Sequence, residues 1–343
     1  MWTVSWSWQA ETRVSTIHSV NSGVIVSHGL KMTYFSPEGK INWEISVPFK
    51  VHCIRESGNS VLILAAHAFY LLNLEDGEYT MNGKATFKGF KDAIGRPGGG
   101  WILSGRNGNI HIFSQEGTGI KRIGFGKIRK LVGWIDRDNL LVHKDDGRLA
   151  VISFGRTDQI KDISDHIWSW VSNLEKGKML MQGGNGGLFQ GIPNKYDWDG
   201  LENLENRDLE PMQASWLEDG WWVMHIDGSL HNISSSEYDA NMIGKGMNLG
   251  DLLDSSSSEM VVSANKSGLI RYWLSESSAK IMADLKSKER AQKASQEVWI
   301  ARKEIFALAQ ENEANGNFES AIDLYKKLGR DNEIKRLRKK MRD

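Results

Sequence analysis

Three tryptophans stand in corresponding places of consecutive sequence repeats and could together bind a ligand. They are Trp134, Trp170 and Trp216, and each directly precedes an aliphatic residue of a predicted strand. Because successive side chains of a strand point to opposite faces, the tryptophans should face away from that aliphatic column. Large aromatic side chains presented together commonly anchor a peptide or another ligand. The sequence therefore predicts an aromatic interaction patch, with packing between neighbouring sheets as the alternative.

Six cations lie within eight residues in the stretch KRLRKKMR. They are Lys335, Arg336, Arg338, Lys339, Lys340 and Arg342. In a final helix such cations stabilise the negative end of the helix macrodipole, which is one interpretation of the cluster. The other is an electrostatic contact with an acidic protein, with RNA or with a membrane surface. No aromatic residues alternate with the cations, so the stretch does not favour RNA in particular.

Motifs of catalysis and of cofactor binding are missing from the sequence. The glycine-rich stretches GRPGGG and GGNGG lack the Lys-Ser/Thr pair of a phosphate-binding loop, and neither HExxH nor GxSxG occurs. The stretch YDWDGLENLEN has part of the spacing of a calcium loop, but Lys195 and Asn206 replace its first and last carboxylate ligands. We therefore expect a protein that is not an enzyme and holds no cofactor or metal.

A glycine recurs at intervals of 39, 40, 39, 39, 42 and 40 residues, with one alanine in the series. The positions are Gly29, Ala68, Gly108, Gly147, Gly186, Gly228 and Gly268. Repeats of this length are typical of propeller blades or of helical arrays. The residues around the glycines must decide between these two architectures.

Turn and strand signals around each glycine identify the repeat as a blade. Four copies have Asn-Gly or Asp-Gly, which suits a two-residue hairpin turn in which both residues need a positive φ. Short apolar strands flank the turns, such as GWILSG and RLAVIS, a third aliphatic column lies upstream, and stretches such as KINWEISV supply a fourth strand. Four strands per unit, seven times over, predict an all-β, seven-bladed β-propeller over residues 1–275.

Tryptophan, which occurs 14 times, has a structural role in such a fold. We expect five copies to fill the gaps between blades: Trp43, Trp101, Trp221, Trp222 and Trp273. Residues 2–8, WTVSWSW, have the period of two of a strand with one buried face. Because the chain turns helical after Trp273, this strand is predicted to complete blade seven and close the ring. The three tryptophans of the interaction patch would then lie near one mouth of the central channel.

Two repeats resemble known propeller families. The stretch VVSANKSGLIRYWLSE, residues 261–276, resembles a WD-repeat blade, with Trp273 in the place of the tryptophan of that motif. The stretch FSPEGKINWEISV resembles quinoprotein-like (PQQ-like) repeats. Leu274 stands where the WD aspartate would be. The resemblance implies a scaffold that displays binding surfaces, and it does not imply a quinone cofactor.

After Ser277 the residues Ala, Lys, Glu and Gln dominate, all of which favour helix. They predict a connector helix over 276–300 and a helical hairpin with a basic end over 301–343. The stretch ALAQENEANGNFESAIDLYKKLG resembles a tetratricopeptide-like hairpin, in which Ala309 and Ala321 match the small residues of the helix contact. Gly316 and Tyr325 match its turn and packing positions, as does Phe318. One such repeat implies a protein-binding surface, not a full superhelix.

Composition and charge favour an ordinary globular protein. The net charge is zero, which disfavours a nucleic-acid or membrane field over the whole surface. Residues 286–343 carry 15 basic and 10 acidic residues, so they have a charge of +5 and the remainder −5. No secretory signal or membrane-spanning run is visible, and the single Cys53 fits a reducing compartment. We therefore expect a cytoplasmic protein without membrane insertion.

These patterns predict a non-catalytic protein–protein interaction scaffold. The propeller and the C-terminal helices would each offer a surface to a protein partner, within a larger assembly or with a second copy bound through the tail. Two alternatives stay open. One is a small-ligand binder or propeller enzyme that uses the channel mouth, and the other is a nucleic-acid-associated scaffold that uses the basic C-terminal stretch.

Overall fold

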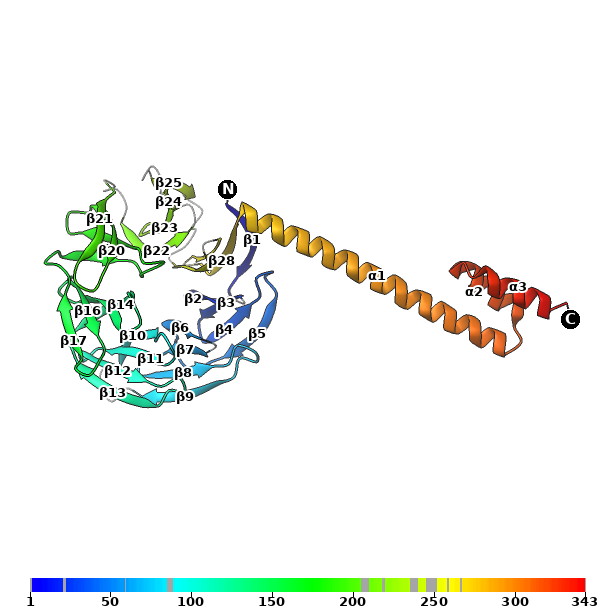
Figure 1. Cartoon of the computed structure of the whole chain (residues 1–343), viewed down its shortest axis with the longest axis horizontal. Coiled ribbons are helices and arrows are strands. Elements are labelled where there is room, and N and C mark those ends of the chain that lie inside the picture. The colour runs from blue at the N-terminus through cyan, green and yellow to red at the C-terminus, as the bar shows by residue number, and fades with distance from the viewer. Residues whose placement is uncertain are drawn as a thin grey trace. The chain divides into compact units, whose positions relative to one another are not determined.

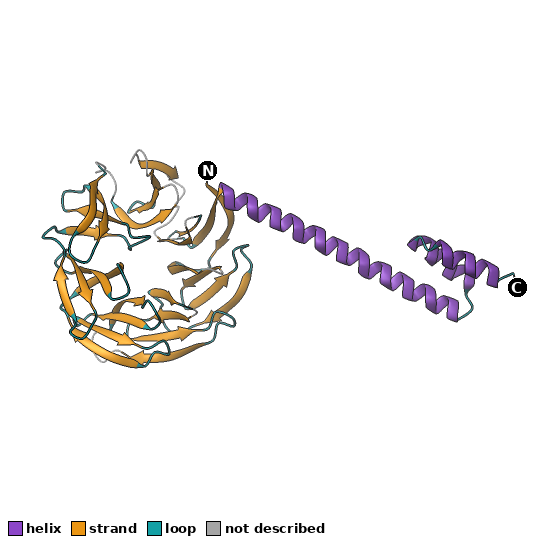
Figure 2. Ribbon diagram, in the orientation of Figure 1, coloured by secondary structure: helices purple, strands orange, loops and turns teal. Residues whose placement is uncertain are grey.

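The computed structural model describes residues 2–20, 23–58, 60–84, 89–204, 210–217, 220–234, 240–244, 252–257, 259–265 and 267–342. The chain divides into two compact units, Met1–Glu276 and Ser277–Asp343. The first unit is built from strands and the second from helices (Figure 2). The division follows the change in composition from glycine-rich repeats to helix-forming residues.

The first unit consists of seven four-stranded antiparallel sheets arranged as a ring (Figure 1). Blade one contains β2 (Val14–Val20), β3 (Gly23–His28), β4 (Lys31–Phe35) and β5 (Ile41–Ser46). Blade two contains β6 (Cys53–Ser57), β7 (Ser60–Leu64), β8 (Ala68–Leu72) and β9 (Tyr79–Lys84). Blade three contains β10 (Phe90–Gly95), β11 (Trp101–Gly105), β12 (Asn109–Phe113) and β13 (Gly119–Gly124). Blade four contains β14 (Ile128–Trp134), β15 (Asn139–Lys144), β16 (Leu149–Ser153) and β17 (Gln159–Asp162).

The remaining three blades follow the same order from the inner to the outer strand. Blade five contains β18 (Trp168–Val171), β19 (Met179–Gly183), β20 (Leu188–Pro193) and β21 (Trp198–Asn203). Blade six contains β22 (Pro211–Leu217), β23 (Gly220–His225), β24 (Leu230–Ser234) and β25 (Ala240–Gly244). Blade seven contains β26 (Leu252–Ser257), β27 (Met260–Ala264), β28 (Leu269–Ser275) and the N-terminal strand β1 (Trp2–Gln9). The predicted seven-bladed propeller, including its closure by the N-terminal strand, is confirmed.

The repeated glycine occupies a different turn from the one predicted. Gly147 has φ 87°, but Asp146 before it does not have a positive φ, so this is not the two-residue turn in which both residues are left-handed. The amide of Gly147 donates to the Lys144 carbonyl at 3.0 Å, and the Asp146 carboxylate accepts from the amide of Arg148 at 3.1 Å. The loop is therefore a three-residue hairpin, in which a turn is followed by a left-handed glycine. Asp or Asn is used for its side-chain acceptor, not for a positive φ.

Apolar side chains from neighbouring blades share each core cluster. Ile102 of blade three packs in the cluster that holds Leu140 of blade four, and Leu180 of blade five packs with Trp221 of blade six. The five tryptophans predicted to fill gaps between blades are all at most 9% exposed, so this prediction is confirmed. Truncation of one such side chain to alanine costs about 3–5 kcal/mol, so these contacts contribute much of the stability of the ring.

Inner strands of adjacent blades are also joined by side-chain hydrogen bonds, at six junctions among the described residues. Each bond links a side chain to a backbone group of the next blade. The pairs are Arg55 to the Ala93 carbonyl, the Leu131 amide to Asp92, Lys130 to the Val171 carbonyl, Trp170 to the Met212 carbonyl, the Leu253 amide to Gln213, and the Ser19 amide to Asp254. Because these bonds lie beside the channel, polar residues there hold the ring together.

The closing strand β1 contains a bulge that the sequence pattern does not predict. Its pairing with β28 shifts between Val4 and Trp6, so the side chains before and after the shift face opposite sides of the sheet. Trp2 lies edge-on to Trp222 of blade six, with ring centroids 4.7 Å apart. Trp6 stacks on Phe35 of blade one at 5.2 Å. The expectation of a single buried face is therefore wrong, and β1 contacts both neighbouring blades.

The second unit consists of three helices: α1 (Glu276–Ala314), α2 (Phe318–Leu328) and α3 (Asp331–Lys340). Helix α1 is continuous through residue 300, where the sequence predicts the connector to end. The core of this unit combines the two small residues of the predicted helix contact with larger side chains of α2 and α3: Ala309, Ala321, Ile322, Tyr325, Ile334 and Leu337. Among the described residues, no helix combines the length and the apolar character that crossing a membrane requires.

Candidate binding site at the mouth of the central channel

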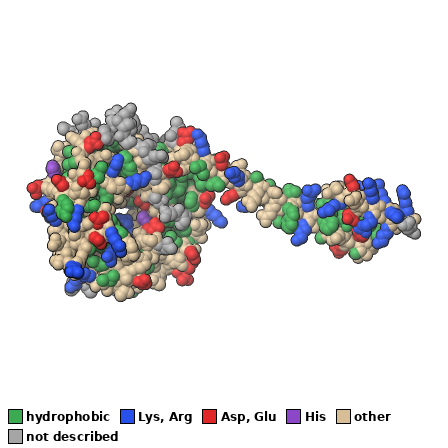
Figure 3. Space-filling model, viewed as in Figure 1, with side chains coloured by type: hydrophobic (Ala, Val, Ile, Leu, Met, Phe, Trp, Pro, Cys, Tyr) green, Lys and Arg blue, Asp and Glu red, His purple; other side chains and the backbone are tan. Residues whose placement is uncertain are grey.

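A cavity of about 440 Å³ lies where the inner strands end and turn into the second strands of the blades. All seven blades contribute to its lining. One contributor per blade, in order from blade one, is His18, Arg55, Ile94, Trp134, Glu175, Trp216 and Asp254. The space-filling view shows the propeller hollowed near the centre of the ring (Figure 3). A cavity of this size suits a small ligand or a few side chains of a partner protein.

The hairpin that joins β18 to β19 in blade five spans part of this mouth. The amide of Leu174 donates to the Val132 carbonyl of blade four at 2.9 Å, and Glu175 accepts from the Trp216 amide of blade six at 2.7 Å. The approach to blade four needs a glycine, because a Cβ on Gly133 would lie 2.5 Å from Leu174 Cβ. One short hairpin therefore fixes the edge of the cavity between three blades.

Two pairs of acidic and basic side chains from the inner strands lie beside the cavity. Arg55 Nη2 lies 3.2 Å from Asp92 Oδ1, and His18 Nδ1 lies 3.2 Å from Asp254 Oδ2. His18 Nε2 is buried without a hydrogen-bond partner among the described residues. These side chains thus bond to one another within the protein, and a ligand there would meet both acidic and basic groups.

Burial shifts the pKa values of two ionisable groups at the channel toward neutral pH. The pKa of Glu175 is raised to about 8, mainly by desolvation and also by the nearby Asp254, against the hydrogen bond from the Trp216 amide. Desolvation lowers the pKa of Lys130 to about 8, although Asp92 opposes that shift. Both shifts have the sign expected when water is removed from a charged group.

The predicted tryptophan patch is only partly assembled by the structure. Trp134 and Trp216 both line the cavity, from opposite sides of the blade-five hairpin. Trp134 Nε1 donates to the Gly95 carbonyl at 2.6 Å, and Lys178 Nζ lies 4.2 Å from the ring centroid of Trp216. Each therefore has packing and hydrogen-bonding contacts as well as a face on the cavity.

Trp170 is not in the place that its sequence alignment predicts. It pairs with Gln182, four residues before the repeated glycine of its blade, whereas Trp216 pairs with Trp221, seven residues before the repeated glycine of blade six. Its indole instead donates to the Met212 carbonyl of blade six at 3.0 Å. Strand β18 is short, and the hairpin after it is longer, so alignment on the aliphatic column places Trp170 several residues out of register. The prediction that three tryptophans share one position is wrong for this residue.

Charged residues of the inner strands contribute to the candidate site, although the sequence patterns did not predict them as site residues. Arg55, Asp92 and Asp254 each adjoin an aliphatic residue of an inner strand and interrupt its apolar run, and Arg55 meets Asp92 beside the channel. A charged residue in an inner strand is costly unless it is paired, so such interruptions are a usable signal of polar groups beside the channel. Glu175 lacks that signal, because it lies in a loop.

The basic cluster of α3 divides into structural and solvent-facing cations. Arg336 makes a bidentate pair with Glu313 of α1, with both N–O distances 2.7 Å, and a further bond to Glu333 at 2.9 Å. Lys340 lies over the ring of Phe318 at 5.2 Å. The other four form no ion pair among the described residues: Lys335, Arg338 and Lys339, which share one face of α3, and Arg342, which lies in the turn after it. Figure 3 shows Lys and Arg side chains gathered on this unit.

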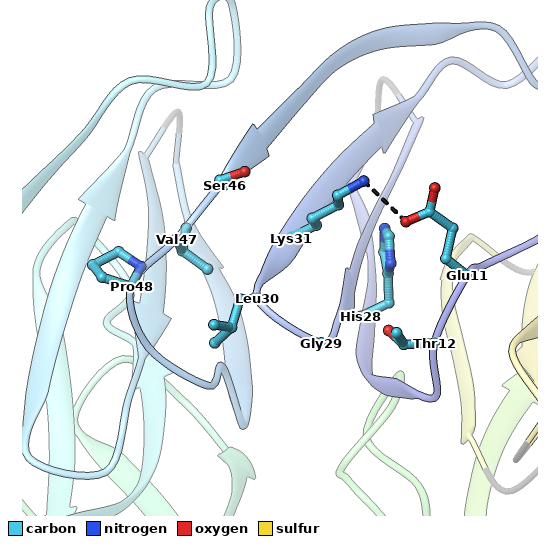
Figure 4. Close-up of a pocket in the computed structure, with 9 residues that line it drawn as sticks. All are labelled: Glu11, Thr12, His28, Gly29, Leu30, Lys31, Ser46, Val47 and Pro48. Atoms are coloured by element: carbon cyan, nitrogen blue, oxygen red, sulfur yellow. Dashed lines mark hydrogen bonds and ion pairs between the residues drawn. The ribbon is translucent and has the colours of Figure 1, made fainter.

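A second cavity, of about 550 Å³, lies at the opposite ends of the blade-one strands (Figure 4). Lys31 bridges its opening and lies 3.0 Å from Glu11 and 3.4 Å from Glu44. His28 at its wall is buried, contacts Thr33 Oγ1 at 3.0 Å, and has its pKa lowered mainly by desolvation. Its polar groups therefore bond to one another, and we consider the channel mouth the better candidate.

Comparison with known proteins gives no family assignment. No protein-family model matches this chain, and no curated protein matches it. The fold therefore stands as a seven-bladed β-propeller followed by a C-terminal helical region, without a more specific repeat family. Within the described ranges, no three His, Cys, Asp or Glu side chains come together in a way that could hold a metal ion.

Backbone strain marks the hairpin at the channel mouth. Lys176 has φ 50° and, among the described residues, is the one non-glycine residue with a positive φ. We expect Lys176→Asn to raise the free energy of unfolding by about 0.5–1 kcal/mol, because Asn tolerates this conformation better than Lys. Urea denaturation measures the change. The exposed Lys127→Asn is the matched control, and an equal effect of both changes would contradict the strain.

Burial of Glu175 should make the stability of the propeller depend on pH. The folded-state pKa lies above the ordinary value, so ionisation opposes folding. The cost is absent below about pH 4.5, increases up to about pH 8, and is constant above that pH. Glu175→Gln keeps an acceptor for the Trp216 amide and should stabilise the protein by about 2 kcal/mol at pH 8, but by little at pH 5. Parallel curves of unfolding free energy against pH for the two proteins would contradict this prediction.

Proposed function

We propose that this protein is a non-catalytic interaction scaffold, whose propeller binds a protein partner at the mouth of the central channel and whose helical unit binds a second. The channel-mouth cavity carries the proposal, because seven blades converge on one concave surface that contains Trp134 and Trp216. Aromatic side chains within a concave surface are common anchors of protein interfaces. The buried thiol of Cys53, whose pKa is raised to about 12 by desolvation, fits a scaffold of the reducing cytoplasm.

The polar groups at the mouth support binding over catalysis. Arg55 and Asp92 are bonded to each other and to backbone groups of adjacent blades. A catalytic acid or base must instead reach the substrate with the proton that it transfers. A propeller enzyme or a small-ligand binder is the alternative, and it would use Glu175, the ionisable group whose pKa is shifted most toward neutrality at the cavity.

Quantitative affinity purification from the native cell tests the proposal. Asn173 is exposed at the cavity, so Asn173→Arg should block the mouth without loss of a side-chain hydrogen bond of the fold. Thr157→Arg, in an exposed loop of blade four, is the matched control. We expect Asn173→Arg to reduce the yield of the co-purified partner about tenfold or more and Thr157→Arg to leave it unchanged. Equal yields with both variants would contradict a channel-mouth interface.

A nucleic-acid-associated scaffold is the second candidate, since three cations of α3 share one solvent-facing side and Arg342 follows directly after the helix. Retention of the full chain on immobilised RNA, measured at increasing salt, distinguishes it. Neutralisation of Lys335, Arg338, Lys339 and Arg342 together should remove the salt-dependent part of the retention, because each phosphate contact contributes about 0.7–0.9 to the logarithmic slope. No retention by the wild-type chain would exclude this candidate. The ionic pairs of Arg336 stay intact in this variant.

A further inference from the structure

The helical unit contains a cavity of about 480 Å³ between α1 and the turn that follows α2. Its lining consists of Trp299, Arg302, Lys303, Phe306, Leu328 and Arg330. The first four lie at spacings of three, four and seven along α1, which places them on one face of that helix. The other two come from the end of α2 and from the residue that precedes α3.

The floor of this cavity is fixed by local structure. Helix α2 ends at Gly329, whose φ of 65° is left-handed, and the amide of Arg330 donates to the Tyr325 carbonyl at 3.0 Å. This is the usual glycine termination of a helix. It places the Arg330 guanidinium 5.3 Å from the ring centroid of Phe306, which itself lies edge-on to Tyr325 at 5.9 Å. The cavity therefore adjoins the folded core of the unit, against which Phe306 packs.

Large apolar side chains remain exposed around the cavity. Trp299 is 62% exposed, and its neighbours Val298 and Ile300 are exposed as well. Lys303 Nζ lies 5.4 Å from the Trp299 ring centroid. Aromatic residues concentrated on an exposed surface are characteristic of interaction sites. The surface is thus more apolar than the folding of this unit requires.

The charges at the rim have one sign. Arg302, Lys303 and Arg330 form no ion pair among the described residues, although each lies on the cavity. The acidic residues of this part of α1, Glu297, Glu304 and Glu311, repeat every seven residues and so lie on another face of the helix. An occupant must therefore offer apolar surface to the floor and negative charge to the rim.

We infer that this cavity is a docking site for an acidic peptide segment of a partner protein. One large apolar side chain of the segment inserts between Trp299, Phe306 and Leu328, and its flanking carboxylates pair with the cations of the rim. Bidentate contact of Arg302 or Arg330 with a carboxylate would give the segment its orientation. This inference deepens the scaffold function proposed above by naming the chemistry of the partner of the helical unit.

A second copy of the helical unit fits the cavity less well. Residues 286–343 have a charge of +5, so two copies repel each other. The middle of α1, KSKERAQKASQE, has almost no apolar stripe and could not extend a helix pair beyond the cavity. A nucleic acid would satisfy the cations but would leave the apolar floor without a matching side chain. Charge and apolar surface together therefore favour an acidic peptide.

Selection from a random peptide display library on the immobilised full chain tests the inference, with counter-selection on Trp299→Ser. Because Trp299 is mostly exposed, this change should leave the unfolding transition intact, which circular dichroism verifies. We expect the selected peptides to combine several Asp or Glu residues with a large apolar residue. Their affinity, measured by fluorescence anisotropy, should fall about tenfold or more on Trp299→Ser and on Arg330→Glu.

Lys293→Glu is the matched control, since it reverses an exposed charge of α1 outside the cavity and should leave the affinity nearly unchanged. Neutral or basic selected peptides, or an affinity that Arg330→Glu leaves unchanged, would overturn the inference. The inference would also be overturned if a bound peptide without acidic residues were displaced by single-stranded RNA. A concentration-dependent dimer that dissociates on Trp299→Ser would overturn it as well. None of these results affects the outcome of the Asn173→Arg test at the channel mouth. The docking-site inference and the proposed scaffold function can therefore fail separately.

Discussion

Asp92→Ala is expected to lower the free energy of unfolding by about 3–5 kcal/mol. Asp92 joins three blades, because its carboxylate accepts from Arg55 Nη2 at 3.2 Å and from the Leu131 amide at 2.9 Å. Its removal leaves a guanidinium that is largely withdrawn from water without its counter-charge, and it leaves a buried amide without an acceptor. Guanidinium chloride denaturation, followed by tryptophan fluorescence, measures the effect.

Asp92→Asn is the matched control for this prediction. Asn keeps an oxygen acceptor for the Leu131 amide but removes the charge opposite Arg55, so we expect a smaller loss than with alanine. The double variant Arg55→Met/Asp92→Leu should recover part of the loss, because it removes both charges together. An Asp92→Ala protein with an unchanged denaturation midpoint would contradict the role of this residue in joining the blades.

Deletion of residues 2–9 is expected to abolish the cooperative unfolding transition of the propeller. The deletion removes β1, which contacts blade six through Trp2 and blade one through Trp6. It also exposes the edge of β28 and the ring of Tyr272, on which Trp6 stacks at 5.1 Å. The total stability of a domain is typically only about 5–15 kcal/mol, so loss of one ring closure removes most of it. Calorimetry measures the transition.

A synthetic peptide with the sequence of residues 2–9 provides the control for that deletion. Added in excess, it should restore the cooperative transition by pairing with β28, since an exposed strand edge accepts another strand. A peptide of the same composition in scrambled order should not restore it. A truncated chain that unfolds as cooperatively as the intact chain would contradict closure of the ring by β1.

The architecture could be predicted from the sequence because it depends on local signals that recur. Glycines such as Gly147 and Gly228 repeat with a nearly constant spacing, and each has a positive φ in a hairpin loop. Burial of Trp101 and Trp222 follows from residue type and strand pattern alone. The number of blades and the N-terminal closure can therefore be predicted from the sequence.

Details that depend on one extra residue could not be predicted in this way. The bulge in β1 turns Trp2 and Trp6 to opposite faces, although their sequence spacing fits a single face. The predicted register of Trp170 is wrong for a related reason. The spacing of the aliphatic residues does not indicate how long the hairpin after β18 is. Period-two patterns carry no information about such insertions.

The candidate sites depend on contacts between distant parts of the chain. His18 and Asp254 meet only because blade one packs on blade seven, and no sequence spacing reveals that contact. The cavity of the helical unit is predictable in part. The shared helix face of Trp299 and Phe306 follows from their spacing, but Arg330 reaches the cavity only because the chain turns at Gly329. Residue types alone could therefore suggest an interaction scaffold, whereas the residues of the two proposed surfaces come together only through packing.

Hydrogen exchange of the full chain, with and without the protein that co-purifies with it, tests the scaffold function most directly. Partner binding at the channel mouth should slow the exchange of amides in the blade-five hairpin, residues 172–178, and at the ends of β14 and β22. Asn173→Arg should abolish that protection. Protection confined to the outer strands of the blades, or a hairpin that exchanges equally fast with and without the partner, would contradict the channel mouth as the binding surface.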